Sequence, residues 1–332
     1  MDGTMTADHY RMKPQTIVYE VSRRPYEKHR TLSVSNAQGL RTPSGVKIPP
    51  AWTDIWMTTD PKSHIQAIGR DSKGRRVYLY SVEHMGRAAA AKFSRLKAFS
   101  AVYPRLIKKL QMDKRKSEEA LVLYLIAKSG FRIGSHTETH AAVQAFGAST
   151  LRCSQVNIEG DKISFDFIGK KGIRVNKVLK DTFLAREIGG RCQENVEKSL
   201  FNTTAEAIRV YLSTIPQGAK FTVKDFRTYL GTLTAYKRIK ELPLPRNGWE
   251  YKKLRKEVGE KVAKELGNST GIALSSYISP EVFCDWESRL PEMLNKNMGK
   301  KGLKSGFFEC IHYDQEVPME DYKDADPLEK LE

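Results

Sequence analysis

The hydrophobic residues that follow position 60 alternate with polar ones, a period typical of β-strands. Residues 64–68 and 75–80 both show this alternation, and residues 69–74 between them contain the glycine and polar residues of a turn. We therefore predict a β-hairpin whose second strand has an apolar face formed by Val77 and Leu79.

The other face of that second strand would present Arg76, Tyr78 and Tyr80 in a row. Guanidinium groups interleaved with aromatic rings suit a strand that lies against duplex DNA, where the cation meets a phosphate and the rings or hydroxyls meet base edges. A strand buried on both faces would explain the same pattern, so both interpretations remain open at this point.

Helical periods dominate from about residue 87. Ser117 can cap a helix that Gly130 ends, and its interior is apolar nearly all round, which predicts a central buried helix. A second hairpin signal turns at residues 169–172. The other predicted helices lie at residues 87–110, 181–215 with a break at 189–190, 226–236 and 251–266.

This change of period divides the chain into a β-rich first part and a mainly helical second part. We place the boundary at residue 88, which gives an N-terminal domain of residues 1–88 and a catalytic domain of residues 89–312. Residues 1–40 are polar and are expected to form a loosely ordered arm, and residues 313–332 an acidic tail.

The formal net charge of the 332 residues is +17. The tail carries eight acidic residues and two lysines, so the rest of the chain carries +23. A body this basic indicates a polyanionic partner, and nucleic acid is favoured over a membrane surface. A solubilising lysine surface is the alternative.

The four cysteines, Cys153, Cys192, Cys284 and Cys310, include no C-x-x-C pair, and the seven histidines show no metal-binding spacing. This argues against a zinc ribbon or a disulfide framework and fits a reducing compartment. The longest apolar run, residues 120–127, is too short to cross a bilayer. We expect a soluble intracellular protein without a metal site.

Several cations occupy positions suited to phosphate chemistry. Arg132 follows the buried helix between two glycines, and Arg227 lies with Lys224 near the start of a helix, where backbone N–H groups and a cation can meet an anion. Lys170 and Lys171 lie at the tip of the second hairpin, where a lysine can act as a general acid. Each signal alone has an ordinary structural explanation.

In order, these residues resemble the catalytic series of the type IB DNA topoisomerases of the small poxvirus and bacterial (viral-type) family. The matching positions are Arg132, Lys170, Lys224, Arg227, Asn268 and Tyr277. The stretches IPPAWTDIW, GRDSKGRRVYLY and KDFRTYLGT also resemble signatures of that family, and the similarity runs from about residue 39 to 285. The resemblance implies an α+β bilobed clamp, with a small β-rich N-terminal domain and a larger, mainly α catalytic domain of the tyrosine recombinase/topoisomerase IB type.

By this resemblance, Tyr277 would attack a backbone phosphorus and form a 3′-phosphotyrosyl link. Arg132 and Arg227 would hold the non-bridging oxygens, and Lys170 would protonate the leaving 5′-oxygen. The enzyme would relax supercoiled double-stranded DNA as a monomer, without ATP, metal or other cofactor. It would act in the bacterial cytoplasm or nucleoid, or in a virion or at a viral replication site.

Two positions depart from the family pattern. Asn268 stands where the family usually has histidine, and an amide can donate a hydrogen bond but carries no charge and shuttles no proton. We expect a slower or pH-shifted enzyme. Glu138 stands where relatives often carry a tyrosine that touches DNA, which places that contact in doubt.

Two other functions share part of this pattern. A tyrosine recombinase uses the same residue types, but it usually has a histidine where this chain has Lys224, and it lacks the N-terminal hairpin. A non-catalytic architectural DNA-binding protein would keep the charge and the fold. The presence of Arg132, Lys170, Arg227 and Tyr277 together argues against this second alternative.

Overall fold

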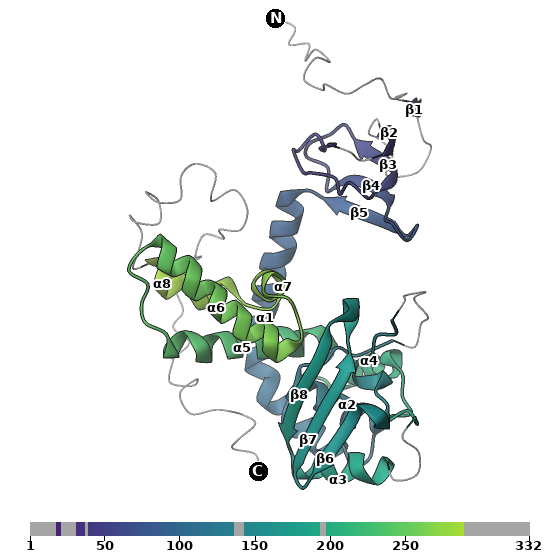
Figure 1. Ribbon diagram of the computed structural model, residues 1–332, viewed down its shortest axis with the longest axis vertical. Helices are drawn as coiled ribbons and strands as arrows, with labels where there is room; N and C mark the ends of the chain where they lie inside the picture. The colour runs from purple at the N-terminus through teal and green to yellow at the C-terminus, as the bar shows by residue number, and fades with distance from the viewer. Residues whose placement is uncertain (1–17, 21–30, 37–38, 136–142, 193–196, 289–332) are drawn as a thin grey trace, which may run out of the picture. The chain divides into compact units, whose positions relative to one another are not determined.

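The computed structural model describes residues 18–20, 31–36, 39–135, 143–192 and 197–288. The chain divides into two compact units, residues 1–92 and 93–332, and the division falls within the long helix α1 (Val82–Asp113). The first unit is a small sheet and the second is mainly helical (Figure 1), as the change of period predicts.

The first unit contains one antiparallel sheet in which the five strands pair in chain order. Its strands are β1 (Val18–Glu20), β2 (Thr31–Asn36), β3 (Thr53–Thr58), β4 (Ile65–Arg70) and β5 (Arg76–Tyr80). β4 and β5 form the predicted hairpin, although β4 extends two residues further than expected. A core that includes Trp52, Ile55 and Met57 packs beneath Val77 and Leu79, so the apolar face of β5 points inward as predicted.

β1 and β2 lie within the stretch that we expected to form a loosely ordered arm, so the structure differs from that expectation. The backbone of β2 pairs with β3 from Thr31 opposite Thr58 to Asn36 opposite Thr53. Unpaired backbone groups at a sheet edge favour the addition of a strand, and polar composition alone did not reveal this partner. The acidic tail and Glu138 lie outside the described residues.

Helix α2 (Glu118–Ser129) is buried along most of its length and lies at the centre of the second unit. The Ser117 hydroxyl accepts a hydrogen bond from Ala120 N, and Gly130 ends the helix in the left-handed conformation, as the sequence predicts. α2 packs against α4, α5 and β8. The other helices are α3 (Thr182–Arg191), α4 (Ala205–Thr214), α5 (Val223–Glu241), α6 (Gly248–Leu266), α7 (Thr270–Ser276) and α8 (Cys284–Ser288).

A three-stranded antiparallel sheet completes the second unit. Its strands are β6 (Val156–Glu159), β7 (Lys162–Ile168) and β8 (Arg174–Lys180). Phe165 and Phe167 of β7 pack edge-on against Phe131, just after α2. This packing fixes the sheet against the end of the central helix, beside Arg132.

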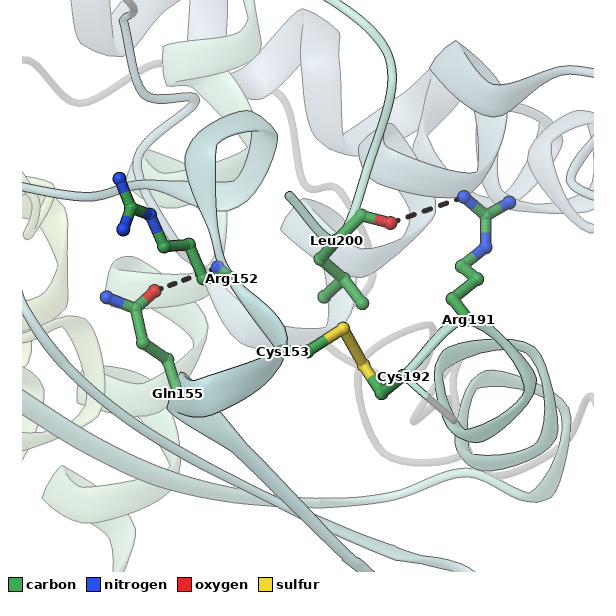
Figure 2. Close-up of a disulfide and its surroundings, with 6 residues drawn as sticks. All are labelled: Arg152, Cys153, Gln155, Arg191, Cys192 and Leu200. Carbon is green, nitrogen blue, oxygen red and sulfur yellow. Dashed lines mark hydrogen bonds between the residues drawn. A yellow bond between two sulfur atoms is a disulfide. The ribbon is translucent and has the colours of Figure 1, made fainter. Parts of the chain in front are cut away.

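A disulfide joins Cys153 and Cys192, although the cysteine pattern in the sequence argued against a disulfide framework. Cys153 opens a short turn before β6, and Cys192 follows the last residue of α3 (Figure 2). The two cysteines are 39 residues apart, but the sheet and α3 return the chain to within 5.3 Å, measured between the Cα atoms. This distance is within the range that a disulfide requires, and the spacing of the cysteines in the sequence gave no sign of it.

None of the helices in the described residues is long and apolar enough to cross a membrane. The same residues contain no cluster of three or more histidine, cysteine or acidic side chains that could hold a metal ion.

Candidate active site

Arg227 lies in the second turn of α5 and is 4% exposed. Its guanidinium donates hydrogen bonds to the carbonyl oxygens of Gly130 and Leu266, the second at 2.9 Å. These carbonyls belong to the C-terminal ends of α2 and α6, where helix carbonyls lack intrahelical partners and carry partial negative charge. Arg227 is therefore held rigidly by its two terminal nitrogens, and its buried Nε–H has no partner among the described residues.

The start of α5 shows the ordinary structural explanation of this stretch. The start of α5 is closed by a capping box, in which Asp225 accepts hydrogen bonds from the backbone and hydroxyl of Thr222. Asp225 also pairs with Arg95 at 3.1 Å. Lys224 stays exposed at this end of the helix.

Tyr277 directly follows α7 and is 7% exposed. Its backbone N–H donates to Ala273 O, and its carbonyl accepts a hydrogen bond from the Thr232 hydroxyl of α5 at 3.1 Å. Gly231 permits this close approach, because a Cβ there would lie 2.8 Å from the Tyr277 carbonyl oxygen. The ring lies with its centre 5.1 Å from the guanidinium carbon of Arg227.

The charges around Tyr277 favour its ionised form. Burial raises the pKa of the phenol, but the charge and proximity of Arg227, together with the charges of Arg132 and Lys224, outweigh this effect and lower the pKa below its ordinary value. Burial lowers the pKa of Arg227 to about 10, so this residue remains a cation at neutral pH. Nearby cations thus shift Tyr277 toward its tyrosinate form.

Arg132 and Asn268 meet at the same place. Arg132 donates to the carbonyl oxygen of Gly267 at 3.4 Å and to Oδ1 of Asn268 at 2.5 Å. The Asn268 Nδ2 is buried and has no hydrogen-bond partner among the described residues. α2 and α6 each end in a left-handed glycine. Arg132 follows the end of α2 and Asn268 follows the end of α6, and the two side chains meet.

The structure places Lys170 and Lys171 at the exposed tip of the β7–β8 hairpin, as predicted. Lys171 adopts a left-handed conformation with φ of 66°, followed by Gly172 at 74°. No hydrogen bond or ion pair of the Lys170 ammonium is found within the described ranges. The structure thus brings together Arg132, Arg227, Asn268 and Tyr277, whereas Lys170 stays on the hairpin tip.

In the first unit, Arg76, Tyr78 and Tyr80 lie on the exposed face of β5, so the interpretation of β5 as a strand buried on both faces is excluded. Arg76 lies 5.7 Å from the Tyr78 ring centre, and the Tyr78 and Tyr80 rings stack at 6.4 Å. The row continues in residues that the sequence did not single out. The ring of His84 in α1 stacks on Tyr80 with the ring centres 5.1 Å apart, and the ring centre of His64 lies 5.0 Å from that of His84.

Two family descriptions match the chain. Residues 83–277, more than half of it, match the catalytic core of eukaryotic DNA topoisomerase I, and residues 26–71 match the N-terminal domain of bacterial DNA topoisomerase IB. The chain belongs to the type IB DNA topoisomerase family, which confirms the resemblance seen in the sequence.

Relatives of this family come from viruses and animals. The DNA topoisomerase 1B of Acanthamoeba polyphaga mimivirus is 28% identical over 255 residues, which cover 70% of this chain and 75% of the viral one. The DNA topoisomerase 1B of Vaccinia virus (strain Copenhagen) is 24% identical over 263 residues, which cover 71% of this chain and 78% of the viral one. The human DNA topoisomerase 1 is 29% identical over 142 residues, 39% of this chain and 18% of the human one. The chain is thus a DNA topoisomerase, an isomerase of the viral type.

Proposed function

We propose that this topoisomerase relaxes supercoiled double-stranded DNA by cutting one strand through a 3′-phosphotyrosyl intermediate and resealing it. The observation that carries the proposal is the buried guanidinium of Arg227 beside the ring of Tyr277. Arg227 Nε and Asn268 Nδ2, which have no partner among the described residues, are suited to donate to phosphate oxygens.

In the proposed cleavage step, Tyr277 loses its phenol proton to water, and the tyrosinate oxygen forms a bond to the phosphorus as the bond to the 5′-oxygen breaks. Arg132 and Arg227 hold the non-bridging oxygens, where negative charge grows in the pentacoordinate transition state. Asn268 donates one further hydrogen bond. Lys170, carried on the hairpin, gives a proton to the leaving 5′-oxygen.

Resealing reverses this step. The 5′-hydroxyl attacks the phosphotyrosyl phosphorus, and the tyrosine oxygen leaves. The phosphotyrosyl bond conserves the energy of the broken bond, so the proposed reaction needs neither ATP nor a metal ion. Between the two steps the duplex beyond the cut turns and loses supercoils.

The proposed DNA-binding residues lie in both units. Arg76, Tyr78 and Tyr80 would contact the duplex from the exposed face of β5, and Lys171 and Lys224 would contact phosphates near the cut. The +23 charge outside the acidic tail supports a polyanionic partner. We propose that a domain of residues 1–88 and a catalytic domain of residues 89–312, of the fold shared with tyrosine recombinases, close on DNA as a bilobed clamp. The enzyme would act as a monomer inside the cell or virion.

Cleavage of a labelled duplex oligonucleotide tests the proposal. The duplex carries a break a few nucleotides beyond the cut, so that the short 5′-hydroxyl product is lost and the covalent complex accumulates. We expect a protein–DNA adduct that maps to Tyr277 and to the 3′-phosphate, and none with Tyr277→Phe. An adduct at another residue, or tight binding without any adduct from the unsubstituted protein, would contradict the proposal. The second result would favour the architectural alternative.

A further inference from the structure

Lys177 lies in β8, on the same hairpin as Lys170, but its side chain is only 11% exposed. A buried lysine is unusual unless its charge is paired. Its ammonium donates to the carbonyl oxygens of Ser129 at 2.7 Å and Glu265 at 3.3 Å, and to Oε1 of Glu265 at 2.5 Å. Lys177 therefore joins the end of α2 to the end of α6.

These two helix ends are the ones that Arg227 also joins. Arg227 donates to Gly130 and Leu266, and each of these residues directly follows a residue whose carbonyl accepts from Lys177. Two cations from different elements thus hold successive carbonyls of the same two helix C-termini, where partial negative charge gathers.

Two residues of the candidate site closely follow these helix ends. Arg132 lies two residues beyond Gly130, and Asn268 comes directly after Gly267. β8 also packs closely against the C-terminal end of α6 at Gly267. A Cβ on Gly267 would lie 2.9 Å from Cγ2 of Val175 in β8. A change in the spacing of the two helix ends would therefore move Arg132, Asn268 and the carbonyls that orient Arg227.

We propose that Lys177, paired with Glu265, is a positioning residue for strand cleavage. It fixes the two helix ends that orient Arg227 and Arg132, and it anchors the hairpin that carries Lys170. This inference rests on the proposed function. Burial lowers the pKa of Lys177 against the opposing effect of Glu265, and the charge of Arg227 lowers it further, as expected for two cations held close together.

The test compares Lys177→Met with Lys180→Met in single-turnover cleavage and in DNA binding. Lys180 is on the same strand, is exposed, and pairs with Asp161 only at the surface at 3.4 Å. We expect Lys177→Met to slow cleavage by about 10- to 100-fold, because small displacements of reacting groups are costly. DNA affinity should stay within about twofold, and Lys180→Met should match the unsubstituted enzyme.

A double variant separates positioning from a loss of stability. Because Lys177 acts in part through Arg227, Lys177→Met combined with Arg227→Lys should slow cleavage by less than the product of the two single effects. Full additivity, or unchanged cleavage by a folded Lys177→Met, would overturn the inference. If Lys177→Met does not fold, Glu265→Gln takes its place, because it keeps the shape of the partner of Lys177. Its cleavage rate, alone and combined with Arg227→Lys, is then judged in the same way.

The same experiment distinguishes this inference from the proposed function. Unchanged cleavage by Arg227→Lys or by Tyr277→Phe would contradict the proposed function itself. Slow cleavage by Arg227→Lys together with normal cleavage by Lys177→Met would contradict only the positioning role.

Discussion

The guanidinium carbon of Arg227 lies 5.1 Å from the centre of the Tyr277 ring, although the two residues are 50 positions apart in the chain. α5 supplies Arg227, and the same helix holds the backbone of Tyr277 through Thr232. The Thr232 hydroxyl also accepts from Ser279 N at 3.1 Å. One helix thus places both the cation and the residue proposed as the nucleophile.

Gly231→Ala should disturb this placement. The new methyl group would meet the Tyr277 carbonyl oxygen at 2.8 Å and Cδ1 of Leu266 at 3.0 Å. Such overpacking costs about 1–3 kcal/mol of unfolding free energy, and we expect cleavage to slow as well. Gly271→Ala is the matched control, because its Cβ would meet nothing within 4 Å. Urea unfolding and single-turnover cleavage measure the effects, and equal behaviour of the two variants would contradict this account.

Lys224→Met should shift the pH dependence of cleavage upward. The Lys224 charge helps to lower the pKa of Tyr277, so its removal raises that pKa and leaves less tyrosinate at a given pH. The rising limb of the rate against pH should therefore move to higher pH. Lys220→Met, at an exposed lysine that is not among the cations that lower the pKa of Tyr277 most, is the control. A limb that stays in place would show that Lys224 does not act on the tyrosine.

Asn268→His should change the cleavage rate. The amide of Asn268 already accepts from Arg132, and its free Nδ2 is the donor proposed for the phosphate. A protonated histidine would make a charge-assisted hydrogen bond, stronger by about 1.4 kcal/mol, which corresponds to about tenfold in rate. The gain should be largest at low pH, where histidine is charged. An unchanged rate across pH would mean that this side chain does not touch the reacting phosphate.

Loss of the disulfide should lower the stability of the second unit. Cys153→Ser or Cys192→Ser opens a loop of about 40 residues, and such a loss costs about 2–4 kcal/mol of unfolding free energy. Urea midpoints with and without a thiol reductant measure this. Cys284→Ser, at a cysteine outside the disulfide, should retain the response to reductant. Equal midpoints in both conditions would show that the bond contributes nothing to stability.

Much of the fold follows from local signals. Ser117 and Gly130 bound α2 as the sequence predicts, and the alternation around Val77 gives β5 its inward face. The contacts that build the site are a different matter. The carbonyls that hold Arg227 come from positions 97 and 39 residues away, and no local pattern specifies which helix ends will meet. The pairing of Cys153 with Cys192 and the role of Lys177 depend on the same long-range packing.

The most direct test of the central claim is the relaxation of supercoiled plasmid in the presence of a metal chelator and without ATP. The enzyme and Tyr277→Phe are compared at equal DNA occupancy. We expect the enzyme to relax the plasmid and Tyr277→Phe to leave it supercoiled while it still binds. Relaxation by Tyr277→Phe, or none by the unsubstituted enzyme bound to the plasmid, would contradict a swivelling mechanism based on this tyrosine.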